Sequence, residues 1–322
     1  MTAILGALFP VFSLIALGLI CARSGYLMPG ADEVLSQFVA RIALPVLAFH
    51  VIATSDPADL AKPAMAIAAV GGPAIVWSAL FLFERWRGAD ASSANVAAFG
   101  ACFGNHAFVG LPVCFVLIGP GAMAPAAVII ALTSSFVFGW GVFMQVITAQ
   151  GKHTLTQGQG LAALLVVGRQ LATNPLVLLS VLGGIFSALH APLPGPVDVL
   201  LTTLGSATGP CALVAIGLFL ARPLHEVASG MALRGVAGKL LLMPAVTCAL
   251  LAAMPPLPPV WLATTLIMAA VPCGTGAFVI GSQSGPRQMQ LGASLVVFSV
   301  IAAAVSLPLM IAVLQRFGIV RL

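Results

Sequence analysis

Two polar side chains that could bind a ligand stand next to each other inside an apolar stretch. Asn105 and His106 follow Gly104 in residues 94–117. An amide offers a donor and an acceptor, and an imidazole can carry a coupled proton near neutral pH. An unpaired amide costs several kcal/mol in an apolar medium, so Asn105 needs a ligand, a water or a backbone partner. The structural alternatives are an Asn105 that caps the backbone of a helix break and a neutral His106 bonded to backbone.

A second group of helix-weakening residues lies in the stretch 259–282. It contains Pro272, Cys273, Gly274, Thr275 and Gly276. We expect this stretch and the one with Gly104 and Pro112 to be broken within the membrane. Unwound backbone at that depth is tolerated where it lines a cavity, and helix N-termini near the breaks suit an anion, so the pair predicts a binding site. Packing glycines and proline kinks are the structural alternative.

Arg41 and Thr133 are further candidate ligands. Arg41 lies nine residues inside the apolar stretch 32–52, where a cation is costly unless it is paired or hydrated. No Asp or Glu is expected inside a span, so Arg41 could be the counter-ion of a carboxylate substrate; snorkelling to the cytoplasmic surface is the alternative. Thr133, with Ser134 and Ser135, can form hydrogen bonds across helices, and holding helices together is the usual role of such hydroxyls.

The composition places these residues in a lipid environment. Of 322 residues, 61% are hydrophobic and 7% are charged, whereas a soluble domain carries roughly a quarter charged residues. The basic residues are dispersed, without a basic run interleaved with aromatics, so no nucleic-acid partner is expected. The six cysteines lack metal-ligand spacing, and no hydrolase motif or P-loop occurs. We therefore expect no metal, no cofactor and no enzymatic activity.

Ten segments are long and apolar enough to cross a bilayer as helices, which takes about 20 residues each. They cover approximately residues 3–22, 32–52, 62–83, 94–117, 123–149, 162–189, 197–221, 233–254, 259–282 and 289–315. The odd-numbered connections hold Arg23, Arg85, Arg87, Lys152, Arg169, Arg222, Arg234, Lys239 and Arg287, and the even ones with the termini hold Lys62, Arg316 and Arg321. The positive-inside rule therefore predicts both termini outside the cytoplasm.

The two halves of the chain repeat each other. The sequence from Gly104 to Val109 recurs from Gly274 to Val279, at an offset of 170 residues. At nearly the same offset, Pro10, Gly18, Pro45 and Pro73 match Pro175, Gly183, Pro210 and Pro244. Because each half has an odd number of spans, the repeats are inverted. We expect a first five-helix repeat at 1–149, a cytoplasmic linker at 150–161 and a second repeat at 162–322.

Residues 35–54, LSQFVARIALPVLAFHVIAT, resemble span 2 of the auxin efflux carrier family, which includes the plant PIN carriers and many bacterial transporters. Asn105 to Pro112, and Pro272 with the glycines after it, resemble spans 4 and 9 of that family. The resemblance implies an all-α membrane protein with ten helices in two inverted repeats, crossing broken helices 4 and 9, and elevator-like alternating access. This fold is similar to that of bile acid:sodium symporters and NhaA.

The resemblance also implies transport of small organic anions, with Asn105 and Thr133 at substrate-contacting positions. The long cytoplasmic loop of plant members is missing, which favours a short bacterial carrier in the inner membrane. We expect a secondary transporter of a malonate-like dicarboxylate. The alternatives are an auxin-like aromatic monocarboxylate, sodium coupling, or a membrane sensor or scaffold. Proton coupling and a homodimer are further expectations, and the direction of transport stays open.

Overall fold

The computed structural model describes residues 2–57, 62–149, 165, 168–169, 172–221 and 230–320. The predicted linker at 150–161 lies outside these residues. Helices make up the regular structure of the described part, and two backbone segments meet at a single antiparallel bridge, Gly104 with Cys273. The expectation of an all-helical protein is confirmed for these residues.

In the first half, the elements are α1 (Thr2–Arg23), α2 (Ala31–Phe38), η1 (Val39–Ala43), α3 (Leu44–Ala53), α5 (Pro63–Trp86), α6 (Ala91–Cys102), η2 (His106–Gly110), α7 (Leu111–Ile118), η3 (Pro120–Ala122), α8 (Met123–Leu132), η4 (Thr133–Val137) and α9 (Phe138–Ala149). In the second half, they are α11 (Pro175–Ala188), α12 (Gly195–Ser206), α13 (Thr208–Leu220), α14 (Gly230–Ala237), η5 (Gly238–Leu242), α15 (Met243–Ala252), α16 (Pro259–Ala270), α17 (Gly276–Ser282) and α18 (Pro286–Arg316).

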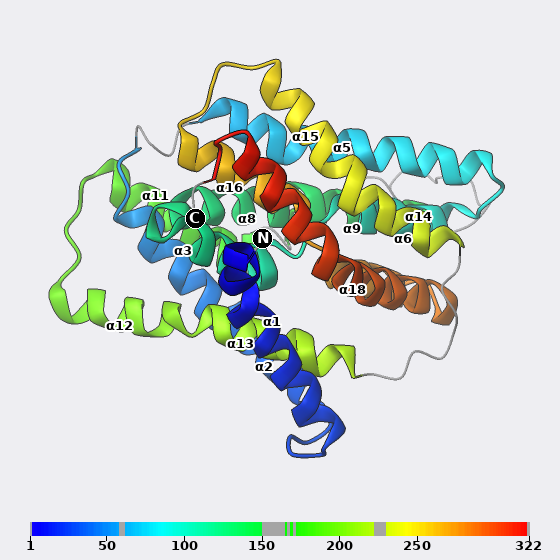
Figure 1. The fold of residues 1–322 in the computed structure, drawn as a ribbon, viewed down its shortest axis with the longest axis horizontal. Helices are drawn as coiled ribbons and strands as arrows, with labels where there is room; N and C mark the ends of the chain where they lie inside the picture. Colours follow the sequence, from blue (N-terminus) through cyan, green and yellow to red (C-terminus); the bar gives the residue numbers. More distant parts are fainter. Residues whose placement is uncertain are drawn as a thin grey trace.

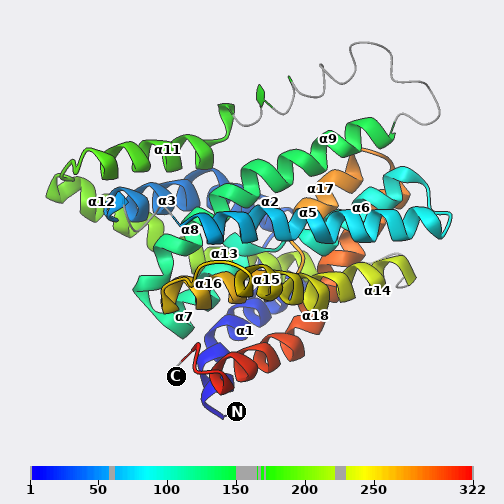
Figure 2. The ribbon, with the colours of Figure 1, turned by 90° about the horizontal axis from the view of Figure 1, so that it is seen from above.

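Six of the described helical segments are long and apolar enough to span a bilayer. They are Ala31–Ala53, Pro63–Trp86, Pro120–Thr148, Gly195–Leu220, Gly230–Ala252 and Pro286–Arg316. Four shorter apolar helices accompany them: Leu8–Arg23, His106–Ile118, Pro175–Ala188 and Pro259–Ala270. The molecule is thus an integral membrane protein whose helices pack around one another (Figures 1 and 2).

Three helices contain a π-helical turn just before a proline. The turns η1, η2 and η5 precede Pro45, Pro112 and Pro244. Proline lacks an N–H and clashes with the carbonyl four residues before it, and a π turn relieves both problems locally. Pro112 therefore does not break its helix, which continues from His106 to Ile118. The expectation that Pro112 interrupts this helix is wrong, because the π turn accommodates the ring.

One group of helices is joined by close backbone crossings. A Cβ on Gly18 of α1 would lie 2.2 Å from the carbonyl oxygen of Val214 in α13. A Cβ on Gly183 of α11 would lie 2.8 Å from the carbonyl oxygen of Phe49 in α3. Such contacts need residues without side chains, as is common between membrane helices. We call α1, α2, α3, α11, α12 and α13 with η1 the first helix group; Figure 1 shows α12 and α13 running past α3 and α1.

A second helix group consists of α5, α6, α9, α14, α15, α17 and α18 with η5. A polar network inside it joins Asn95 of α6 to Trp77 of α5 and Gln145 of α9: Trp77 Nε1 donates to Asn95 Oδ1 at 3.0 Å, and Asn95 Nδ2 donates to Gln145 Oε1 at 2.6 Å. Gln145 in turn donates to Ser92 at 2.7 Å and contacts Ser284. A fully bonded buried network holds its helices in one arrangement.

The second group also contains a buried carboxylate. Glu84 of α5 is fully buried and accepts from Nε and Nη2 of Arg234 in α14 at 2.6 and 2.8 Å. The expectation of no acidic residue inside a span is therefore wrong at this position. Asp198 also lies in a helix, α12, where it bonds Nε2 of His50 at 2.7 Å. Both carboxylates have cationic or imidazole partners, which is the usual way to place a charge at depth.

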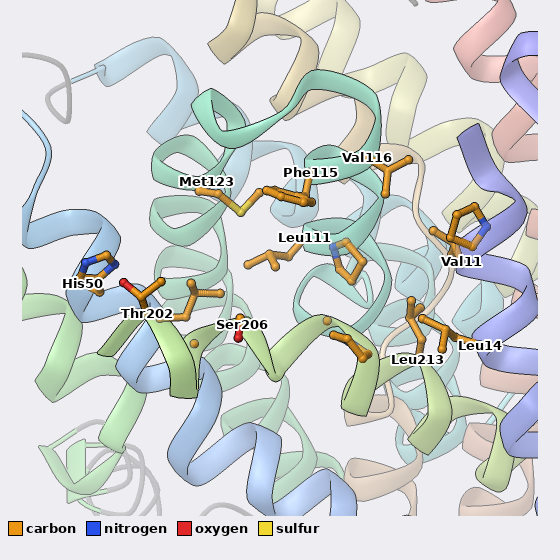
Figure 3. A pocket seen from close by; sticks show the side chains of 16 residues that line it. Val11, Leu14, His50, Leu111, Phe115, Val116, Met123, Thr202, Ser206 and Leu213 are labelled. Atoms are coloured by element: carbon orange, nitrogen blue, oxygen red, sulfur yellow. The ribbon is translucent and has the colours of Figure 1, made fainter. Parts of the chain in front are cut away.

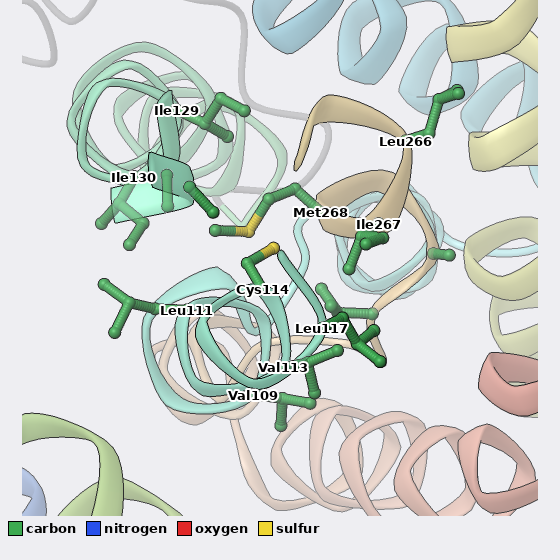
Figure 4. Packing of buried hydrophobic residues seen from close by; sticks show 14 of the residues in the cluster. Val109, Leu111, Val113, Cys114, Leu117, Ile129, Ile130, Leu266, Ile267 and Met268 are labelled. Atoms are coloured by element: carbon green, nitrogen blue, oxygen red, sulfur yellow. The ribbon is translucent and has the colours of Figure 1, made fainter. Parts of the chain in front are cut away.

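Helices α7, α8 and α16 pack through apolar side chains. Figure 4 shows Met268 of α16 reaching between Cys114 of α7 and Ile130 of α8. A Cβ on Gly110 would lie 2.4 Å from the sulfur of Met268, so this thioether fills the space beside a glycine. One half-helix from each break, α7 and α16, is thereby held in a packed core.

Candidate functional site

Two helices are interrupted and their unwound segments cross. The helix α6 ends at Cys102 and resumes as η2 at His106, while α16 ends at Ala270 and α17 begins at Gly276. Asn105 N–H donates to the Pro272 carbonyl at 2.8 Å, and Gly274 N–H donates to the Phe103 carbonyl at 2.9 Å. We call these two segments, 103–105 and 271–275, the crossover.

The crossover satisfies much of its own backbone, as buried polar groups require. Besides the two bonds between its segments, Cys273 N–H donates to Oγ of Ser299 in α18 at 2.9 Å. A Cβ on Gly104 would lie 2.6 Å from Nε2 of His106, and one on Gly274 would lie 2.8 Å from the Phe103 ring. These two glycines are needed because ring side chains pack directly against the crossing backbone.

A cavity of about 240 Å³ lies against the crossover. Its lining combines backbone, amides, hydroxyls and aromatic rings, and no Asp, Glu, Lys or Arg among the described residues contributes to it. The lining residues are Ala40, Leu44, Phe103, Gly104, Asn105, His106, Ala107, Phe108, Ile130, Thr133, Ser134, Phe138, Asn174, Leu176, Gly274, Thr275, Gly276 and Val279. A few polar groups in an otherwise apolar hollow are typical of a small-molecule site.

Asn105 carries an amide without a partner. Its side chain is 4% exposed, and Nδ2 has no hydrogen bond to any described residue. The residue precedes the first turn of the helix His106–Ile118 but its side chain makes no capping bond. A buried donor left unsatisfied costs about 1–3 kcal/mol. The capping alternative is therefore not what this side chain does, and the amide is free to donate to a molecule in the cavity.

His106 is positioned by Thr133. Nδ1 of His106 lies 3.1 Å from Oγ1 of Thr133, and that hydroxyl also lies 2.8 Å from the Ile129 carbonyl. His106 and Thr133 thus share one hydrogen bond, and its donor depends on which ring nitrogen of His106 carries the proton. The bond fixes the imidazole ring, while the side chain of His106 stays 6% exposed.

The structure brings most of the predicted site residues to one place. Gly104, Asn105, His106, Thr133, Gly274, Thr275 and Gly276 line the cavity. Pro272 and Cys273 lie in the crossover but do not line it, and Cys273 is fully buried. Arg41 is exposed and does not line the cavity, although its neighbour Ala40 does. Arg41 therefore does not face a ligand there.

Sequence reasoning missed two residues near the crossover. Asn174 lines the cavity, and its Oδ1 accepts from Leu176 N–H at 2.9 Å, so it caps α11. The dipeptide Asn174-Pro175 is a helix-start signal that could have located it. Lys239 was expected in a cytoplasmic connection, but it is fully buried in η5 with Nζ 2.7 Å from the Ala269 carbonyl. Its distance from the helix start, nine residues after Gly230, was the available signal.

A second, larger cavity of about 460 Å³ lies between α1, α3, α7, α8, α12 and α13. Figure 3 shows Met123 and Phe115 on one side and Ser206 and Leu213 on the other, with His50 beside Thr202. Pro112 lines this cavity rather than the crossover. Its lining is predominantly apolar, so the smaller crossover cavity is the better candidate for a polar ligand.

Comparisons with known proteins agree with a transport role. A protein of Rhizobium meliloti (strain 1021) named "Putative malonate transporter" is 27% identical over 306 residues, which is 94% of each chain. The family model described as "Membrane transport protein" matches residues 3–311. The resemblance seen in the sequence is thereby confirmed, and the expectation that the chain is not an enzyme is confirmed by the same match. The chain belongs to the Membrane transport protein family, that of the auxin efflux carriers.

Proposed function

We propose that this protein is a secondary transporter of small organic anions, with a malonate-like dicarboxylate as its substrate and the crossover cavity as its binding site. The observation that carries the proposal is the unpaired Nδ2 of Asn105, nine-tenths buried and lining a cavity at a pair of helix breaks. An N–H donor suits a carboxylate oxygen. The first N–H groups of the helix that begins at His106 lack partners within it and add a positive dipole end.

The size of the cavity and the named relative support a small substrate. At about 240 Å³, the cavity is below the range of about 300–1,000 Å³ for drug-sized ligands. The Rhizobium protein carries malonate in its name and aligns over nearly the full length of this chain. A dicarboxylate with two short arms could reach Asn105 on one side and Asn174 or Thr275 on the other.

The proposed architecture is ten spans in two inverted repeats, 1–149 and 162–322. The close crossings support it, because an offset of 165 residues relates Gly18 to Gly183 and Phe49 to Val214. The contact of Gly18 with Val214 is thus equivalent to that of Gly183 with Phe49. Such paired contacts are expected from a pseudo-two-fold axis in the membrane plane.

The crossover obeys the same relation. An offset of 170 residues exchanges Gly104 with Gly274 and Phe103 with Cys273. The bridge between Gly104 and Cys273 then maps onto the neighbouring pair, Phe103 and Gly274, which shares a hydrogen bond. The substrate site would lie on the pseudo-two-fold axis, near the middle of the membrane.

Alternating access would come from movement between the two helix groups. The crossover segment 103–105 follows α6, and the segment 271–275 leads into α17; both helices belong to the second helix group. Asn174 and Leu176, which also line the cavity, belong to α11 and its start in the first helix group. A cavity shared by two separately packed groups can open on either side when one group slides, which is the elevator mechanism. Figure 2 shows the N and C marks close together. Ten spans would place both ends on the same face of the membrane, which the positive-inside rule assigns to the periplasm of a bacterial inner membrane.

Uptake into proteoliposomes tests this function. We expect saturable uptake of radiolabelled malonate, competed by other short dicarboxylates more strongly than by an aromatic monocarboxylate. Stronger competition by the aromatic acid would favour an auxin-like substrate. A flat result across a panel of mono- and dicarboxylates would contradict transport of organic anions and favour a sensor or scaffold.

A further inference from the structure

A second feature near the crossover is a buried cation, Lys239, that has no carboxylate partner among the residues the structure describes. Lys239 has no exposed surface, and its Nζ donates to the Ala269 carbonyl at 2.7 Å. Neither of the ion pairs Glu84–Arg234 and His50–Asp198 includes it. A charge within a membrane span is expensive and marks a functional site by default.

The position of the ammonium group explains how its charge is compensated. Ala269 is the last residue but one of α16, whose terminal carbonyls lack partners within the helix and carry the negative end of its dipole. A cation at this end is stabilised by that partial charge. The Lys239 charge therefore compensates a helix end that the break in α16 creates.

The other helix that ends at the crossover lies beside the same lysine. The neighbour of Lys239, Gly238, packs on Ala101 near the end of α6, where a Cβ would come within 2.9 Å of the Ala101 side chain. Lys239 does not line the crossover cavity. Lys239 is thus a positioning residue at the C-terminal end of α16. The N–H groups of the helix that begins at His106 stay free for the anion.

In the proposed repeat, the position equivalent to Lys239 in the first half of the chain is not a lysine. The offset of 171 residues between Pro73 and Pro244 places Ala68 of α5 at the equivalent position in the first half. Ala68 is buried and cannot supply a charge. A purely structural support for broken helices would be expected in both halves, whereas the charged residue is present in the second half alone.

We propose that the Lys239 ammonium is the resident cation of the transport site, occupying the place at the α16 carbonyl end that a coupling sodium ion would otherwise need. This inference rests on the proposed transport of an organic anion. It follows that transport does not require Na⁺, because the compensating charge is covalently held. It also follows that an arginine, which keeps the charge, should replace Lys239 better than an uncharged residue of similar length.

The test compares malonate uptake into proteoliposomes in Na⁺ and in K⁺ buffers. We expect wild-type uptake to be equal in both buffers, Lys239→Arg to keep at least a third of it, and Lys239→Met to lose at least tenfold. Arg316→Met, which removes an exposed charge at the end of α18, should match wild type. Lys239→Met with uptake within twofold of wild type, or wild-type uptake that needs Na⁺, would overturn the proposal.

Melting of the detergent-solubilised wild-type protein supplies a second measurement that does not depend on any variant or on transport. We expect the same melting temperature in NaCl and KCl at equal ionic strength. A stabilisation specific to Na⁺ would reveal a sodium site and contradict a resident lysine. If wild type moves no acid at all, the proposed function fails on the uptake assay, and this melting comparison still tests whether the protein binds Na⁺ in place of a resident lysine.

Discussion

Replacing Asn105 with alanine should weaken substrate binding without weakening the fold. In the free protein, Nδ2 of Asn105 has no partner among the described residues, and its removal relieves a penalty of about 1–3 kcal/mol. The lost packing of a short side chain offsets part of this gain. We therefore expect a melting temperature in detergent that is unchanged or up to about 3 °C higher.

The effect on binding has the opposite sign. A hydrogen bond from Nδ2 to a carboxylate contributes about 1.5–3 kcal/mol, so its loss raises the Kd roughly 10- to 150-fold. At a malonate concentration of about 100 times the wild-type Kd, the ligand stabilises the protein by about 2.7 kcal/mol. A 100-fold weaker variant would be stabilised by only about 0.4 kcal/mol. The thermal shift caused by malonate should therefore nearly vanish in Asn105→Ala.

Asn95→Ala is the matched control. Asn95 is buried, as Asn105 is, but its amide is fully bonded: it accepts from Trp77 and donates to Gln145 and to the Gly141 carbonyl. Its removal leaves several buried groups without partners, which should cost about 2–5 kcal/mol. The reasoning about Asn105 is refuted if both variants lose stability alike, or if Asn105→Ala retains the full malonate shift.

Three further predictions concern the surrounding structure. Thr133→Val removes the hydrogen-bond partner of His106 Nδ1 and should slow uptake several-fold, whereas Thr133→Ser should keep the wild-type rate. Equal rates in the two variants would argue against this bond. Arg234→Met leaves the buried Glu84 carboxylate without its cation and should lower the free energy of unfolding by about 3 kcal/mol. Glu84→Ala should cost less, because the Arg234 guanidinium that remains is a third exposed; the melting temperatures of the two variants decide the order. A Cβ on Gly217 would lie 2.0 Å from the Ile15 carbonyl, so Gly217→Ala should lower the melting temperature, while Gly184→Ala, with open space, should not.

The sequence predicted an all-helical membrane protein with two interrupted helices, because both features depend on local signals. Apolar stretches of about 20 residues and glycine-rich interruptions can be read without knowing the fold. The repeated motif at Gly104 and Gly274 predicted that the two segments serve one site, and these residues do line one cavity. The substrate-binding role of these residues stays a prediction.

The sequence did not predict the surroundings of several residues correctly, because these depend on packing between distant segments that no local pattern shows. Lys239 sits nine residues into its helix, and only the arrival of the α16 carbonyl end makes burial of its charge tolerable. Glu84 lies one residue beyond the predicted span 62–83, and Arg234 from the other half of the chain holds it in a buried position. Arg41 suggested a counter-ion by its depth alone, and its helix turns it away from the cavity. Pro112 was expected to break a helix that its π turn keeps continuous.

Counterflow of malonate in proteoliposomes tests the central claim most directly, because only a carrier with one alternately exposed site exchanges its substrate across the membrane. Vesicles loaded with unlabelled malonate should accumulate external radiolabelled malonate transiently above its equilibrium level. Asn105→Ala vesicles should not, while Arg316→Met vesicles should. Passive equilibration without overshoot in the wild type would indicate a channel, and equal overshoot in Asn105→Ala would contradict a binding site at the crossover.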